Sequence, residues 1–124
     1  MSETSKVYDV RQRSYLYALD IVKFLERLPN DYVTQTLGRQ LLRAATSVGA
    51  NIIEAKASSS KRDFSNFYSH SLKSANEAKF WLGLFQDSGK APREAVKPLL
   101  DETGELGNIL ASSILTIKGK RRHF

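Results

Sequence analysis

The sequence predicts an all-α protein that folds as an antiparallel, up-and-down four-helix bundle. Apolar residues recur at spacings of three and four along most of the chain, and the period-two alternation of β-strands is absent. Turn-forming residues divide the 124 residues into four long segments. The loops between these segments are short, so consecutive helices must lie side by side and antiparallel.

The four predicted helices cover roughly residues 8–28, 31–57, 61–87 and 92–118. The first ends before Pro29, because a proline disfavours helical backbone at the preceding residue. Asn30 is the expected N-cap of the second helix. A variant of the capping box, Ser60 with Asp63 three residues later, marks the start of the third helix.

The boundaries of the fourth predicted helix depend on one glycine and two prolines. Gly89 suits the left-handed position that ends the third helix, and Pro92 suits the first turn of the fourth. Pro98 either kinks the fourth helix or marks its true start. Neither a linker nor an internal repeat interrupts the pattern, so residues 1–124 are predicted to form one domain with a basic tail at 118–124.

Composition places the chain among soluble globular proteins. Hydrophobic residues make up 41% and charged residues 26%, and cysteine is absent. The first residues lack the apolar core of a signal peptide, and no apolar run approaches the roughly 20 residues that cross a bilayer. We therefore expect a cytoplasmic protein without membrane contact.

The first predicted helix carries two apolar stripes on well-separated faces. One consists of Tyr15, Ala18, Leu19, Val22 and Leu25, and the other of Tyr17, Ile21, Phe24 and Leu28. A helix of a monomeric bundle buries one face, so the extra stripe predicts a homo-oligomer. The alternative is that these residues pack under the N-terminal segment or in a splayed core. The pattern leaves open which stripe faces the core, and we assign the interface to Tyr17, Ile21, Phe24, Leu28, Phe80, Leu84 and Ile109.

The sequence offers no recognisable catalytic or metal site. The histidines are His70 and His123, and the Glu-x-x-His motif of di-iron bundles does not occur. Phosphate-binding loops and nucleophile elbows are also absent from the sequence. We predict a nonenzymatic protein without a cofactor.

A polar stripe borders the apolar face of the second predicted helix. Because Arg and Glu next to a core must be paired, we interpret it as a hydrogen-bonded seam with the third helix, with a ligand or phosphate site as the alternative. Its predicted members are Gln40, Arg43, Ser47, Asn51, Glu54 and Glu77.

The net charge of +6 favours a polyanionic partner, although ordinary solvated charge is the alternative. The candidate nucleic-acid-binding residues are Arg39, Arg43, Lys61, Arg62, Lys118, Lys120, Arg121 and Arg122. We expect the basic tail at the opposite end of the bundle from Lys61 and Arg62, so that the clusters do not merge within one subunit.

The second and third helices carry a family resemblance. Residues 40–55 read QLLRAATSVGANIIEA, which resembles the pattern Q-x-x-R-A-x-x-S-x-x-x-N-I-x-E-G of the four-helix-bundle proteins encoded in 23S rRNA intervening sequences. Asp63-Phe64 and the run from Lys73 to Glu77 continue the likeness. Ala55 replaces the usual Gly, and Leu42-Arg43-Ala44 replaces a common Arg-Arg-Ala, which removes one candidate RNA contact.

The second half of the chain is similar to a related protein, the accessory variability determinant of diversity-generating retroelements. Phe80-Trp81-Leu82 and the stretch from Glu105 to Ser112 carry this likeness. The resemblance implies a homopentameric ring with a basic surface. It favours a nonenzymatic protein that binds nucleic acid, RNA before DNA, through phosphate contacts. The alternative is an adaptor that binds a reverse transcriptase.

Overall fold

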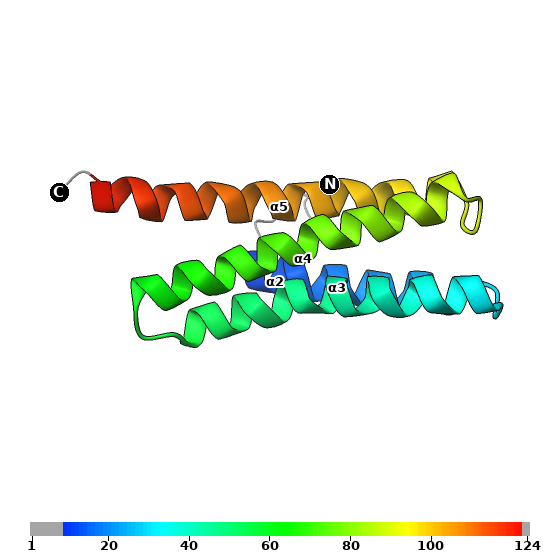
Figure 1. The fold of residues 1–124 in the computed structure, drawn as a ribbon, viewed down its shortest axis with the longest axis horizontal. Coiled ribbons are helices and arrows are strands. Elements are labelled where there is room, and N and C mark those ends of the chain that lie inside the picture. The colour runs from blue at the N-terminus through cyan, green and yellow to red at the C-terminus, as the bar shows by residue number, and fades with distance from the viewer. Residues whose placement is uncertain (1–8, 123–124) are drawn as a thin grey trace, which may run out of the picture.

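The computed structural model describes residues 9–122, and the side chains of residues 9–119. Four helices and no strand occur in this part of the chain, which confirms the predicted all-α class. They run antiparallel along the long axis of the molecule (Figure 1). The helices are α2 (Val10–Glu26), α3 (Tyr32–Ala57), α4 (Lys61–Asp87) and α5 (Arg93–Arg122).

Side-chain caps fix where the helices begin. The carboxylate of Asp9 accepts a hydrogen bond from the backbone N–H of Gln12 at 2.8 Å, which places the start of α2 later than the sequence suggested. Asp31, not Asn30, caps α3 and accepts from the N–H of Thr34 at 2.9 Å. The Ser60 hydroxyl caps α4 as predicted, through the N–H of Asp63 at 3.1 Å.

The structure shows the backbone conformation of Gly89 and the position of Pro98 relative to the start of α5. Gly89 follows α4 with φ of 77°, the left-handed conformation expected of it. Pro98 lies inside α5, which begins at Arg93, so it does not mark the start of that helix. The helix continues to Arg122, so the predicted tail is helical as far as the structure describes it, and His123 and Phe124 lie outside the described residues.

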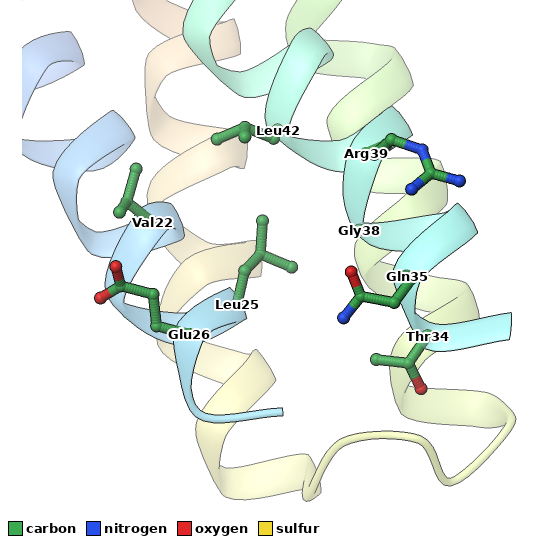
Figure 2. A pocket seen from close by; sticks show the side chains of 8 residues that line it. All are labelled: Val22, Leu25, Glu26, Thr34, Gln35, Gly38, Arg39 and Leu42. Carbon is green, nitrogen blue, oxygen red and sulfur yellow. The ribbon is translucent and has the colours of Figure 1, made fainter. Parts of the chain in front are cut away.

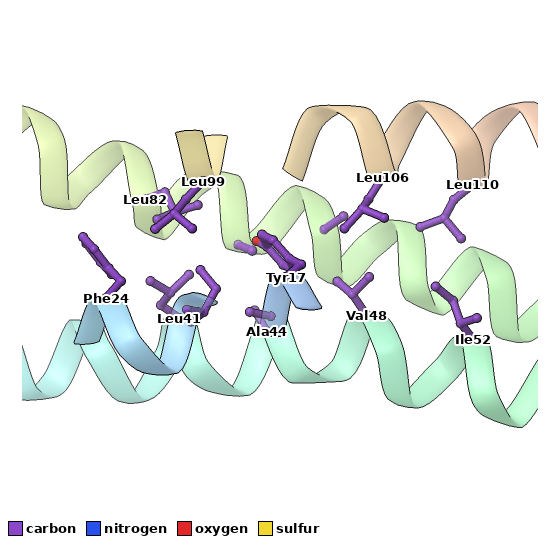
Figure 3. Packing of buried hydrophobic residues seen from close by; sticks show 14 of the residues in the cluster. Tyr17, Phe24, Leu41, Ala44, Val48, Ile52, Leu82, Leu99, Leu106 and Leu110 are labelled. Carbon is purple, nitrogen blue, oxygen red and sulfur yellow. The ribbon is translucent and has the colours of Figure 1, made fainter. Parts of the chain in front are cut away.

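One apolar core runs along the bundle axis. Each helix contacts two others: α3 packs on α4, α4 packs on α5, and α2 packs on both α3 and α5. Figure 3 shows α3 presenting Leu41, Val48 and Ile52 to side chains from the facing helices. Phe24 and Phe85 meet edge to face with their ring centroids 5.7 Å apart.

The structure corrects the interface predicted on the first helix. Tyr17, Ile21 and Phe24 are 1%, 0% and 7% exposed, and Leu28 packs against the core they belong to. The hydroxyl groups of Tyr17 and Thr103 are hydrogen-bonded at 2.7 Å, so burial of the phenol leaves no polar atom unsatisfied. Of the other stripe, Tyr15 and Leu19 are exposed, whereas Leu25 packs against the core. The two stripes have the same helical spacing, which is why the sequence alone does not show which one is buried.

Within the described residues, no helix has the length and apolarity needed to span a membrane.

Candidate nucleic-acid interface

Basic side chains gather at the end of the bundle where α3 gives way to α4. In an up-down bundle the fourth helix ends where the second ends, so α5 terminates beside the α3–α4 turn (Figure 1). This corrects the expectation that the basic tail lies at the opposite end from Lys61 and Arg62. We call this region the basic end and define it by the exposed side chains Lys56, Lys61, Arg62 and Lys118, with the backbone of residues 120–122.

The positive charges of the basic end are not paired with carboxylates among the described residues. None of Lys61, Arg62 and Lys118 forms an ion pair with another described residue. Lys56 places its ammonium group 5.7 Å from the centroid of the Phe64 ring, a cation–π distance. Two exposed acidic residues, Glu54 and Asp63, lie in the neighbouring turns, so the excess charge remains positive.

Arg43 does not belong to the basic end, because its charge is already paired. Its Nη2 donates to Glu77 Oε2 at 2.6 Å and to Gln40 Oε1 at 3.0 Å. Its side chain is 63% exposed, so the ion pair lies at the surface and contributes little stability.

Arg39 lies toward the opposite end of the molecule. It lines a cleft of about 290 Å³ between α2 and α3, and Figure 2 shows the apolar side chains of Val22 and Leu25 on the facing wall. Glu26 lines the opposite wall of the same cleft and forms no ion pair with Arg39. The predicted basic residues therefore separate into a basic end and two arginines outside it.

The residues of the predicted polar seam lie between α3 and α4. The Ser74 hydroxyl donates to Ser47 Oγ at 3.0 Å, and Asn51 Nδ2 donates to the Ser47 carbonyl at 2.9 Å. At the far end of the seam, Trp81 Nε1 donates to Glu77 Oε2 at 3.1 Å. Glu54 is exposed and outside this network. Because the seam satisfies its own polar groups, it has little capacity left for a ligand.

The exposed apolar surface lies mainly between α2 and α3. Tyr15, Leu16 and Ile53 are 68%, 43% and 54% exposed, and they line a groove of about 730 Å³ that we call the α2–α3 groove. On α4, Phe80 and Leu84 are also exposed, as the interface prediction requires, whereas Ile109 is half-buried.

Some residues of this region were missed by the sequence reasoning. Lys56 was overlooked because it lies in a mostly apolar helix, away from any run of basic residues. Asn108, Ser112 and Thr116 follow one another at spacings of four on α5 and line an open slot at the basic end. Their spacing was a usable signal, since it places three polar side chains on one helix face.

The described residues hold no group of three or more His, Asp or Glu side chains arranged to bind a metal ion.

Comparison with known proteins agrees with the all-α fold. The family model described as "23S rRNA-intervening sequence protein" matches residues 6–112. The chain is similar to a crystal structure of a protein of unknown function from the S23 ribosomal protein family of Bacteroides thetaiotaomicron, with 35% sequence identity and a TM-score of 0.77. The similarity covers 85% of this chain and 97% of the other. A search of curated proteins gives no significant match.

Proposed function

This chain belongs to the 23S rRNA-intervening sequence protein family, and we propose that it is a nonenzymatic, homo-oligomeric protein that binds RNA through its basic end. The observation that carries the proposal is the convergence of Lys56, Lys61, Arg62 and Lys118 at one end of the bundle without ion-pair partners among the described residues. RNA is preferred over DNA because the description of the family refers to 23S rRNA.

Phosphate contacts are the proposed source of affinity. Lysine and arginine side chains that neutralise phosphates release condensed counterions, and this release makes binding strongly dependent on salt. The last turns of α5 project past the α3–α4 turn (Figure 1), and their sequence continues with Lys120, Arg121 and Arg122. Such contacts position a nucleic acid without reading its sequence.

The proposed oligomer is a ring, with a pentamer suggested by the family resemblance. The α2–α3 groove and the Phe80–Leu84 ridge lie on different helices of one subunit. A head-to-tail contact that seats the ridge of one copy in the groove of the next covers both patches, and such contacts form a ring when the rotation between successive copies closes. Several basic ends on one particle then bind a long RNA with avidity.

Fluorescence anisotropy tests this function. Protein whose mass has been fixed by light scattering is titrated into labelled structured RNA and duplex DNA, each at two salt concentrations. We expect an oligomer that binds RNA with an affinity that falls steeply with salt. Absence of binding at low salt would refute the phosphate-binding function.

A second candidate function is that of an adaptor for a protein partner such as a reverse transcriptase. The observation that favours it is the α2–α3 groove, an exposed apolar surface whose rim includes Tyr15 and Leu16. A protein that binds no RNA but co-purifies with a reverse transcriptase encoded beside it would establish this function in place of the first.

A further inference from the structure

Among the described residues, 9–122, three helices reach the basic end of the bundle: α3, α4 and α5. The helix α2 begins at Val10, and Arg13 in its first turn already reaches the middle of α5, where it pairs with Glu102 at 2.8 Å and Glu105 at 2.9 Å. Figure 1 shows α2 starting near the middle of the long axis, so the remaining length of α3, α4 and α5 is not flanked by it. Leu110 and Ile114 of α5 remain buried in the core, and the side of α5 next to them is not covered by any described residue of α2.

This opening forms a slot of about 630 Å³. Its walls are the ring of Phe64 from α4 and the side chains of α5 between Asn108 and Ile117. We define the slot by these residues. The slot is an open groove on the surface and not an enclosed cavity.

The walls of the slot combine apolar surface with unused hydrogen-bonding groups. Phe64, Ile109 and Ile117 supply the apolar part and are half-buried. One face of the Phe64 ring is stacked on Tyr68 with the centroids 4.5 Å apart, so only the rest of the ring lines the slot. Asn108, Ser112 and Thr116 are exposed, and their side chains form no hydrogen bond with another described residue. In the polar seam between α3 and α4, by contrast, Asn51, Ser47 and Ser74 are hydrogen-bonded to one another and are not available to a ligand. Polar groups of the slot are thus available to a ligand.

The slot also lies inside the positive field of the basic end. Lys56 approaches the Phe64 ring, Lys61 and Arg62 precede Phe64 on α4 by less than one turn, and Lys118 follows Ile117. No acidic side chain contributes to the slot walls. This charge selects a ligand that carries negative groups beside an apolar ring.

We propose that the slot binds an unpaired nucleotide of the RNA, with the base packed against Phe64 and its edge hydrogen-bonded by Asn108, Ser112 or Thr116. The proposal rests on the proposed RNA binding and adds the class of RNA that is recognised. Bases inside a duplex are stacked and cannot enter a slot, whereas bases of bulges, loops and ends can be splayed out and held on aromatic side chains. The phosphates of that nucleotide meet the surrounding lysines.

The test compares two labelled RNA duplexes with the same number of nucleotides and the same blunt ends, one fully paired and the other with a central bulge in place of some of the base pairs. Stacking of a base on an aromatic side chain predicts that the wild-type oligomer prefers the bulged RNA by roughly tenfold. Ser112→Leu fills the slot without touching the lysines and should abolish the preference, while the salt dependence of binding is retained. Asn76→Leu adds the same side chain to an exposed position elsewhere and is the matched control.

A photoreactive uridine placed in the bulge gives a second readout. Crosslinks should map to the α5 peptide that contains residues 108–117. Equal affinities of the wild-type protein for the two RNAs, or a preference that survives Ser112→Leu, would overturn the slot proposal. Salt-sensitive binding of both RNAs in that case would leave the phosphate-binding function intact, whereas no binding of either RNA at low salt would refute both.

Discussion

Replacing Tyr17 with phenylalanine should lower stability at neutral pH and raise it at alkaline pH. Tyr17 is 1% exposed, and its hydroxyl is paired with Thr103 Oγ1, which itself donates to the Leu99 carbonyl at 2.6 Å. In Tyr17→Phe, Thr103 keeps its acceptor, so the loss is that of one buried hydrogen bond. We expect the free energy of unfolding at pH 7 to fall by about 1 kcal/mol.

The sign of the effect reverses because burial raises the pKa of Tyr17 to about 12, against 10.0 for an ordinary tyrosine. Between these values the unfolded chain loses the phenolic proton while the native chain keeps it, so stability falls as pH rises through this window. At pH 11 the wild-type protein has lost about 1.4 kcal/mol from this source, and the full loss above pH 12 approaches about 2.7 kcal/mol. Tyr17→Phe loses none of it.

Urea unfolding of both proteins at pH 7 and pH 11 measures these differences. All other titrating groups are common to the two proteins, so their contributions cancel in the comparison. The variant should be about 1 kcal/mol less stable at pH 7 and slightly more stable than the wild type at pH 11. A constant difference at the two pH values would refute the reasoning that Tyr17 is buried as a neutral phenol.

Three further predictions concern the fold and the assembly. Ser60→Ala removes the cap of α4 and should lower the free energy of unfolding by about 1 kcal/mol in urea titrations, with Ser59→Ala in the same turn close to neutral. Arg13→Ala and Glu102→Gln should show a coupling of about 1 kcal/mol in a double-mutant cycle that shrinks in high salt; additive effects would mean that the pair does not fasten α2 to α5. Ile53→Ser in the α2–α3 groove should shift the mass measured by light scattering toward the monomer without unfolding the protein, whereas an unchanged mass would remove the groove from the oligomer interface.

The sequence was sufficient for the helices because their signals are local. Ser60 bonds to a backbone group three residues away, and the conformation of Gly89 depends on its own missing side chain, so both could be predicted without tertiary information. The sequence predicts Asn30 as the cap of α3, and the structure has Asp31 there. Both residue types make good caps, so the sequence pattern does not distinguish these neighbouring positions.

Tertiary features were harder to predict. The two stripes of α2 have the same period, and only the partner hydroxyl of Thr103, distant in sequence, shows why Tyr17 is the buried one. The predicted position of the basic tail is wrong for a different reason. In an up-and-down bundle the fourth helix runs in the same direction as the second, so its C-terminus lies beside the α3–α4 turn. The slot beside Phe64 depends on where α2 begins, and this boundary is set by the cap at Asp9.

Removal of charge from the basic end is the most direct test of the central claim. The double variant Lys61→Gln, Arg62→Gln is compared with Lys23→Gln, Lys79→Gln, which lowers the net charge equally at exposed positions outside that end. The slope of log affinity for RNA against log salt should decrease in magnitude by about 1.4 in the first variant, roughly 0.7 for each lost phosphate contact, and change little in the second. Equal slopes in the two variants would contradict binding through the basic end.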